Sequence, residues 1–211
     1  MNYKNIILIP EGIFFKEKTA QKNALNKIAK LHNDAFNREL FTTLFERYEN
    51  SSRSMQINLI LTALFPDEDK STILTSFFEA LGFEHRLLKN VDQTVEKLNN
   101  QANLFITSIY PQAVISKRLR QAKIDLPLIG AKSNNFTPIS NLIEEIINKN
   151  KLDKNETLII GSNLSDEIQA ANDLNIPSLW VSTNRKVPIT PHPNLHVKKF
   201  EDVLFYFMNS I

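Results

Sequence analysis

Short, uninterrupted apolar runs recur along this chain, and they constrain its fold more than any other feature. The first run, Ile6-Ile7-Leu8-Ile9, stops at Pro10. Four more runs follow, at residues 104–107, 127–130, 157–161 and 178–181. Such runs are typical of strands buried on both faces of a parallel sheet. Helical patterns separate the later runs, at residues 112–122, 138–149 and 166–174. The alternation predicts an α/β fold with a Rossmann-like, doubly wound parallel sheet.

One long segment interrupts this alternation. Residues 16–85 contain no strand-like run. They show helical patterns near residues 20–31, 36–48, 53–65 and 71–81. Breaks at Pro66 and Gly82 separate the later patterns. We therefore expect an all-helical domain at 16–85, inserted directly after the first strand of an α/β core domain made of residues 1–15 and 86–211.

Composition excludes several classes of protein. The chain has 25 Lys and Arg against 23 Asp and Glu and shows no basic stripe, so nucleic-acid binding is not expected. The absence of cysteine excludes disulfides, thiol catalysis and thiolate metal sites. Four glycines are too few for a glycine-rich phosphate loop. No apolar run approaches the roughly 20 residues of a bilayer span, and no cleavage site follows the first run. We expect a cytoplasmic protein without membrane contact.

The predicted sheet also indicates where a site should lie. In open parallel sheets, ligands bind beyond the carboxyl ends of the strands. The residues that follow the predicted strands are 9–13, 107–111, those just before Pro138, and 161–167. We expect these segments to meet at one edge of the sheet.

Two of these segments carry a family resemblance. Residues 153–181, with Gly161-Ser162-Asn163 after a strand and Asp166-Glu167 at the next helix, are similar to the last motif of the haloacid dehalogenase (HAD) superfamily. Residues 5–16 align with its first motif without a gap. The insert after the first strand resembles the helical cap of that superfamily. The branch that the chain most resembles is that of small-molecule phosphatases, including bacterial pyrimidine 5′-nucleotidases.

The resemblance implies a chemistry that begins with an aspartate. In the superfamily this Asp attacks phosphorus and forms an aspartyl-phosphate. The corresponding residue is Ile9, which has no lone pair and cannot bind Mg²⁺. The second family Asp, a general acid and base, corresponds to Glu11. Glu11 could still transfer a proton and is the best catalytic candidate.

The remaining motif positions are also partly changed. The phosphate-binding Thr or Ser of the family corresponds to Thr107, with Ser108 beside it, and these two residues are the candidates for binding a phosphate. The family Lys falls near Thr137. The first Mg²⁺-binding Asp of the last motif corresponds to Ser162, and the later acid to Glu167. Glu11 and Glu167 are the only metal-ligand candidates, and they are weak ones because Mg²⁺ needs a nearly octahedral oxygen shell.

These substitutions predict a degraded active site on an intact fold. The favoured hypothesis is a HAD-like protein without phosphatase activity, which binds a small phosphorylated molecule or a protein partner through the former active-site cleft. No cofactor is expected in that case. One alternative is an active Mg²⁺-dependent phosphatase or 5′-nucleotidase that uses Glu11 and Glu167. Another is a structural or interaction protein whose cleft is filled.

Some of the same residues also have simple structural interpretations. Thr137 and Pro138 are typical of an N-cap and first position of a helix. Ser165 is expected to cap the next helix, with Glu167 favouring its positive end. Arg118 is expected on a solvated helix face.

Overall fold

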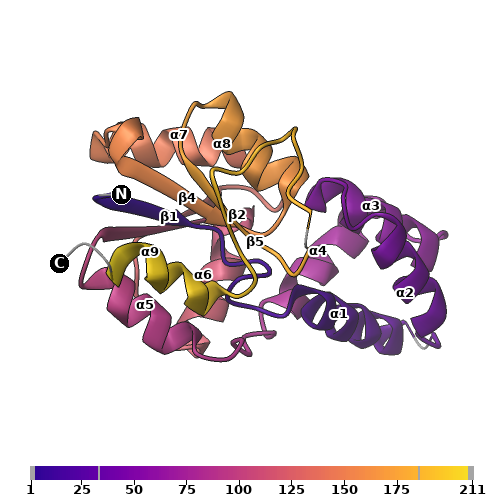
Figure 1. The fold of residues 1–211 in the computed structure, drawn as a ribbon. Helices are drawn as coiled ribbons and strands as arrows, with labels where there is room; N and C mark the ends of the chain where they lie inside the picture. Colours follow the sequence, from indigo (N-terminus) through magenta and orange to yellow (C-terminus); the bar gives the residue numbers. More distant parts are fainter. Residues whose placement is uncertain (1–2, 33, 185, 209–211) are drawn as a thin grey trace.

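Six parallel strands form a single sheet in this computed structural model, which describes residues 3–32, 34–184 and 186–208. The strand order is β3-β2-β1-β4-β5-β6, so the chain winds outward in both directions from the β1–β4 pair (Figure 1). This arrangement confirms the predicted doubly wound sheet. The strands are β1 (Asn5–Leu8), β2 (Asn103–Pro111), β3 (Leu128–Ala131), β4 (Thr157–Gly161), β5 (Ser178–Val181) and β6 (Leu195–Val197).

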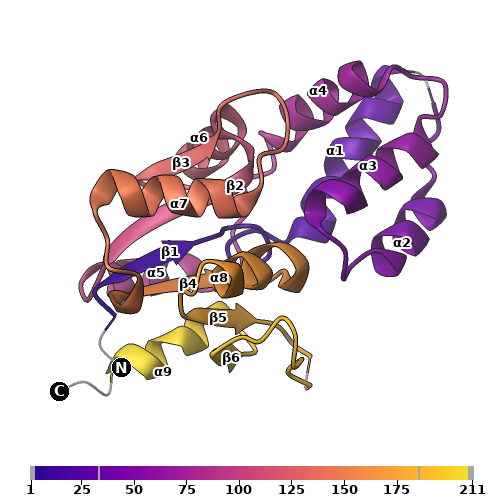
Figure 2. The ribbon, with the colours of Figure 1, turned by 90° about the horizontal axis from the view of Figure 1, so that it is seen from above.

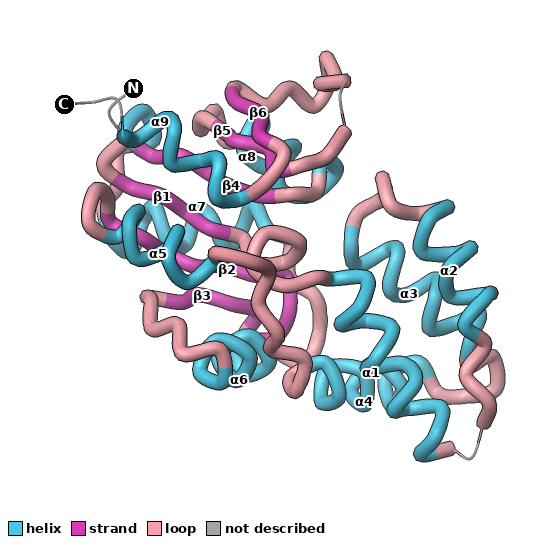
Figure 3. Tube along the Cα trace, turned by 60° about the horizontal axis from the view of Figure 1, so that its bottom comes forward, coloured by secondary structure: helices cyan, strands magenta, loops and turns pink. Residues whose placement is uncertain are grey.

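The centre of the sheet is apolar on both faces. Ile6 of β1 pairs with Leu104 of β2 and with Leu158 of β4, and these three side chains are buried. Helices α7 and α8 cover one face, while α5, α6 and α9 cover the other (Figures 1 and 3). Their bounds are α5 (Val91–Asn99), α6 (Gln112–Gln121), α7 (Ile139–Asn150), α8 (Gln169–Asp173) and α9 (Phe205–Met208).

Four helices follow β1 and lie off the carboxyl ends of the strands (Figure 2). They are α1 (Glu17–Leu31), α2 (Arg38–Arg47), α3 (Arg53–Leu64) and α4 (Lys70–Leu81). In this group, which we call the helical cap, α1 packs on α4 and α2 on α3. The helical patterns predicted after the first strand correspond to these helices, while the domain boundaries at 15/16 and 85/86 stay a prediction. One apolar cluster runs through both parts of the chain and includes Phe14 beside the sheet and Phe77 in α4.

Two predicted helix starts differ from the structure. Helix α7 begins at Ile139, its N-cap is Pro138, and the Thr137 side chain does not cap it. The turn after β4 is a π-helical segment, Leu164–Ile168, which is capped by Asn163, whose side-chain oxygen accepts a hydrogen bond from the Asp166 amide. Ser165 instead donates its hydroxyl to the backbone oxygen of Asn50 in the cap. An asparagine side chain caps as well as a serine does, so the sequence allowed either residue.

None of the helices among the described residues combines the length and the apolar character that a membrane span requires.

Candidate functional site

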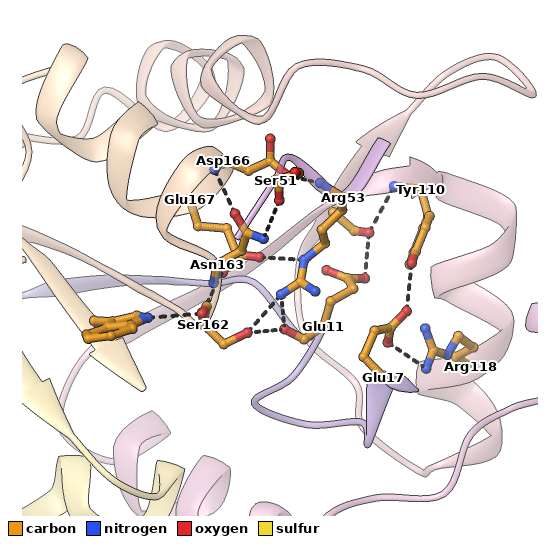
Figure 4. A network of polar contacts seen from close by, with 12 residues as sticks. Glu11, Glu17, Ser51, Arg53, Tyr110, Arg118, Ser162, Asn163, Asp166 and Glu167 are labelled. Atoms are coloured by element: carbon orange, nitrogen blue, oxygen red, sulfur yellow. Dashed lines mark hydrogen bonds and ion pairs between the residues drawn. The ribbon is translucent and has the colours of Figure 1, made fainter. Parts of the chain in front are cut away.

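The predicted segments meet at the carboxyl edge of the sheet, and an arginine from the cap lies among them (Figure 4). Glu11 follows β1, Ser108 lies in β2, and Ser162 and Glu167 follow β4. Arg53 is the first residue of α3. The edge therefore combines acidic and hydroxyl groups of the core with one cation from the cap.

The Arg53 guanidinium bonds to three positions of the core. Its Nη2 donates to the backbone oxygen of Glu11 and to Ser162 Oγ, both at 2.8 Å. Its Nε donates to Glu167 Oε1 at 2.9 Å. The Arg53 side chain is 9% exposed and that of Glu167 is 1% exposed. This contact is a buried ion pair between the cap and the core.

The start of α3 explains why Arg53 reaches this place. Ser52 caps the helix through a hydrogen bond from the Met55 amide, which makes Arg53 the first helical residue. The first amides of a helix lack partners inside the helix. The Arg53 amide donates to Asp166 Oδ2 at 2.6 Å, and a carboxylate at this end is also favoured by the helix dipole. Asn163 Nδ2 adds a hydrogen bond to the backbone oxygen of Ser51 at 3.1 Å.

Both oxygens of Glu167 accept hydrogen bonds. Oε1 accepts from Arg53, and Oε2 accepts from the backbone amides of Ser162 and Asn163. Burial raises the pKa of the Glu167 carboxyl, while the Arg53 charge and these donors act in the opposite direction. Because every polar neighbour is a donor, the geometry favours the ionised carboxylate. Glu167 therefore holds both the loop after β4 and the cap arginine.

Two glycines make this close packing possible. A Cβ at Gly161 would lie 2.3 Å from Glu167 Oε2, and a Cβ at Gly12 would lie 2.3 Å from Ser162 Oγ. Gly12 also has a φ of +84°, which side-chain-bearing residues rarely adopt. The site thus depends on two of the four glycines of the chain.

Glu11 occupies a different environment from Glu167. Its carboxyl is fully buried, Oε1 accepts a hydrogen bond from Ser108 Oγ at 2.7 Å, and Oε2 has no partner among the described residues. Burial, followed by the negative charge of Glu17, raises the pKa of Glu11 to about 7, while Arg53, Ser108 and Arg118 oppose this shift. Glu11 is therefore partly protonated near neutral pH.

Glu11→Gln should remove a pH dependence of stability. The pKa of Glu11 is about 7 in the folded chain and 4.5 for an ordinary Glu, so the folded state keeps a proton that the unfolded state releases between these values. Wild-type stability should therefore fall as pH rises from 4.5 to 7, by at most about 3 kcal/mol from this group. We expect urea unfolding at pH 5 and pH 8 to show a smaller fall for Glu11→Gln.

The matched control for this experiment is Glu144→Gln, on the exposed side of α7. It should keep the wild-type pH dependence. Equal falls in wild type and Glu11→Gln would contradict the buried, proton-binding role of Glu11.

A second buried polar cluster lies next to Glu11. Tyr110 donates its hydroxyl to Glu17 Oε1 at 2.6 Å, and Arg118 Nη2 lies 3.5 Å from Glu17 Oε2. Arg118 also donates from Nε to the backbone oxygen of Glu84 at 2.7 Å, and its guanidinium lies 4.0 Å from the centre of the Phe15 ring. Arg118 is fully buried, so the prediction that it is solvated was wrong. The ion pair with Glu17 and the hydrogen bond to the Glu84 carbonyl offset part of the cost of burying this charge. Nη1 and Nη2 of Arg118 have no hydrogen-bond partner among the described residues.

Within the part of the chain that the structure describes, no side-chain hydrogen bond links the other predicted site residues to this network. Ile9 is 1% exposed and belongs to the apolar cluster. Thr107 is buried, and its hydroxyl has no hydrogen-bond partner among the described residues. Thr137 is half-buried, and its amide donates to the backbone oxygen of Ile109 at 3.4 Å. Phosphate binding at Thr107 and Ser108 stays a prediction, and the Ser108 hydroxyl is engaged with Glu11.

The donor set does not fit Mg²⁺. This ion requires a nearly octahedral shell of oxygens, with carboxylates among them. The Ile9 side chain supplies no oxygen. The backbone oxygen of Glu11, Ser162 Oγ and Glu167 Oε1 already accept hydrogen bonds from Arg53, and Glu167 Oε2 accepts from two backbone amides. Across residues 3–32, 34–184 and 186–208, no group of three or more His, Asp or Glu side chains could hold a metal ion.

Sequence reasoning missed Arg53, although the sequence contains a signal for it. Arg53 is the only charged residue between positions 53 and 64. Arg53 directly follows the Ser52 cap and is the first residue of a helix that is otherwise uncharged. A lone charge in this position indicates that the side chain has a specific partner of opposite charge. Glu17 and Tyr110 were also missed, and the sequence shows no comparable signal for them.

The chain belongs to the haloacid dehalogenase-like hydrolase family. Residues 20–181, more than half of the chain, match the sequence profile of that family. This finding confirms the predicted HAD resemblance. No curated protein matches the chain in sequence.

Solved structures share the same fold. The HAD-hydrolase YfnB from Bacillus subtilis, described as bound to magnesium, has a TM-score of 0.82 at 16% identity, covering 98% of this chain and 99% of that chain. A Haemophilus somnus 129pt protein described as a predicted phosphoglycolate phosphatase has a TM-score of 0.71 at 18% identity, with 98% of each chain covered. A Thermotoga maritima protein described as a β-phosphoglucomutase has a TM-score of 0.72 at 13% identity, covering 99% and 100%. At these identities the likeness is one of fold.

Proposed function

We propose that this HAD-family chain has lost phosphatase activity and that the Arg53 guanidinium takes the place of a metal ion. The observation that carries the proposal is the set of Arg53 hydrogen bonds to the Glu11 carbonyl, Ser162 Oγ and Glu167 Oε1. The family resemblance assigns Ser162 and Glu167 to metal-binding positions. A fixed positive charge among these oxygens repels a divalent cation by Coulomb's law.

The position of the nucleophile supports the same proposal. Ile9 is a buried hydrocarbon side chain where the family resemblance places an attacking carboxylate. An aspartyl-phosphate cannot form without that oxygen. Without a metal or a lysine at position 137, little is left to stabilise the charge of a transferring phosphoryl group.

The cap also closes over the site. Arg53, Ser51 and Asn50 in the cap bond to residues 162–167 of the core. The cavity that remains at the mouth of the site measures about 220 Å³ and is lined in part by Asn50, Asn163 and Trp180. Ligand sites commonly measure about 300–1,000 Å³, so this opening suits only a small phosphorylated ligand or a side chain of a protein partner. We infer that the protein acts by binding rather than by turnover and needs no resident cofactor.

A hydrolysis assay tests this proposal. We expect purified protein with Mg²⁺ to release no phosphate from p-nitrophenyl phosphate or nucleoside monophosphates above the rate without protein. A known phosphatase, assayed in parallel, shows that the conditions support catalysis. Hydrolysis that requires Mg²⁺ and disappears in Glu11→Ala would contradict the proposal.

That outcome would support the alternative of an active Mg²⁺-dependent phosphatase or nucleotidase. One observation favours this alternative: the pKa of Glu11, at about 7, suits a group that transfers protons at neutral pH. The Glu11→Ala arm of the assay separates the two proposals.

A further inference from the structure

A second and larger cavity lies at the carboxyl edge of the sheet. It lies outside the Arg53 cluster, by which we mean Arg53 and the residues that bond to it, Glu11, Ser162, Asp166 and Glu167. It has a volume of about 510 Å³, within the range of about 300–1,000 Å³ that is common for small-molecule sites. The segments that line it are 12–13 after β1, 181–183 at the end of β5, 198–201 after β6, and 88–89 before α5. Carboxyl ends of parallel strands are where open α/β sheets bind ligands. The cavity therefore has a suitable size and position for a ligand.

The rim of this cavity is positively charged. Lys89, Lys198 and Lys199 line it, and Glu201 is its only acid. Glu201 is already engaged, because Asn90 donates a hydrogen bond to Oε2 and Lys199 Nζ lies 3.8 Å from Oε1. Within the described part of the chain, Lys89 and Lys198 form no ion pair. Two free ammonium groups at one rim form a local excess in a chain whose net charge is only +2.

Part of the wall of the cavity is apolar. The half-buried Leu88 supplies most of this apolar surface, and Val181 and Phe200 add small exposed parts. Ile13 lies beneath this surface and is fully buried. A pocket with an apolar wall and a few charged groups at its rim selects ligands that match both features. A fully hydrated inorganic anion would use the lysines but not the wall, whereas a neutral apolar molecule would use the wall but not the lysines.

We propose that this cavity binds a small organic anion, a phosphate ester or carboxylate attached to an apolar body. The anionic group lies against Lys89 and Lys198, and the apolar body lies against Leu88, Val181 and Phe200. No residue of the Arg53 cluster lines this cavity. The proposal therefore does not depend on the loss of phosphatase activity.

Phenylphosphonate is a suitable probe because it carries an anionic head on an apolar ring and cannot be hydrolysed as an ester. NMR titration without Mg²⁺ should show saturable shifts of amides at 12–13, 88–89, 181–183 and 198–201. If the cavity also binds carboxylates, benzoate should shift the same amides. If benzoate shifts none of them, the ligands of the cavity are limited to phosphate esters. Inorganic phosphate and phenol should each bind at least several-fold more weakly than phenylphosphonate.

The decisive comparison uses two pairs of lysines. Lys89→Gln with Lys198→Gln should weaken phenylphosphonate binding by roughly tenfold, because two charged contacts are lost. Lys30→Gln with Lys149→Gln, on the exposed surfaces of α1 and α7, removes the same charge elsewhere and should change affinity less than twofold. Equal weakening by both pairs, or no saturable shift at these amides up to about 10 mM probe, would overturn the proposal.

Discussion

Arg53→Ala is expected to lower the free energy of unfolding by about 3–5 kcal/mol. The Glu167 carboxylate, only 1% exposed, would stay buried without its cation. Removing one partner of a buried ion pair is costly because the remaining charge has lost its water and gains no replacement. The substitution would also free the Glu11 carbonyl and Ser162 Oγ from the guanidinium. Urea unfolding of wild type and variant measures the effect.

Two further variants separate this charge effect from loss of side-chain volume. In the double variant Arg53→Ala, Glu167→Gln no unpaired charge remains, so we expect it to be more stable than Arg53→Ala alone. Lys18→Ala breaks the exposed pair with Glu46 in the cap and should cost at most about 1 kcal/mol. A loss for Arg53→Ala as small as that for Lys18→Ala would show that the buried pair does not hold the cap to the core.

Arg118→Ala is expected to have a comparable effect, a loss of about 3–5 kcal/mol. The variant leaves Glu17 without its nearby cation and the backbone oxygen of Glu84 without its donor. It also removes the guanidinium that lies over the Phe15 ring. Thermal and urea unfolding both provide the measurement.

Arg120→Ala is the matched control, because Arg120 lies on the exposed side of the same helix. Surface substitutions of this kind usually change stability by no more than about 0.5 kcal/mol. Equal losses for Arg118→Ala and Arg120→Ala would contradict a buried structural role for Arg118.

The contrast between Arg118 and Arg120 shows which sequence signal predicts the burial of a charged side chain. Arg118 lies four residues after Val114 and three after Ile115, which places it on their side of α6. Helical spacing therefore indicated burial, although residue type suggested exposure. The spacing was the better guide because the charge has partners that are far away in the sequence.

The strands were predictable where both faces are covered. The runs at Ile6–Ile9 and 157–161 became β1 and β4 because burial on both sides requires continuous apolar residues. Strand β6 was missed because it has only three residues, includes His196 and lies at the edge of the sheet. An edge strand needs no continuous apolar run.

The candidate site was predictable only in part. The carboxyl-end rule placed Glu11, Ser162 and Glu167 at one edge, as the structure shows. The lone charge of α3 indicated that Arg53 has a partner, but the identity of that partner was not predictable, because 114 positions separate Arg53 from Glu167. That contact depends on how α3 packs against the core, which no local pattern specifies.

We propose that a guanidinium replaces a metal ion in this site. Titration of the wild-type protein with Mg²⁺, followed by calorimetry at pH 7.5, tests it most directly. We expect no saturable heat at Mg²⁺ concentrations up to about 10 mM. Saturable binding at submillimolar Mg²⁺ that is lost in Glu167→Gln would contradict it.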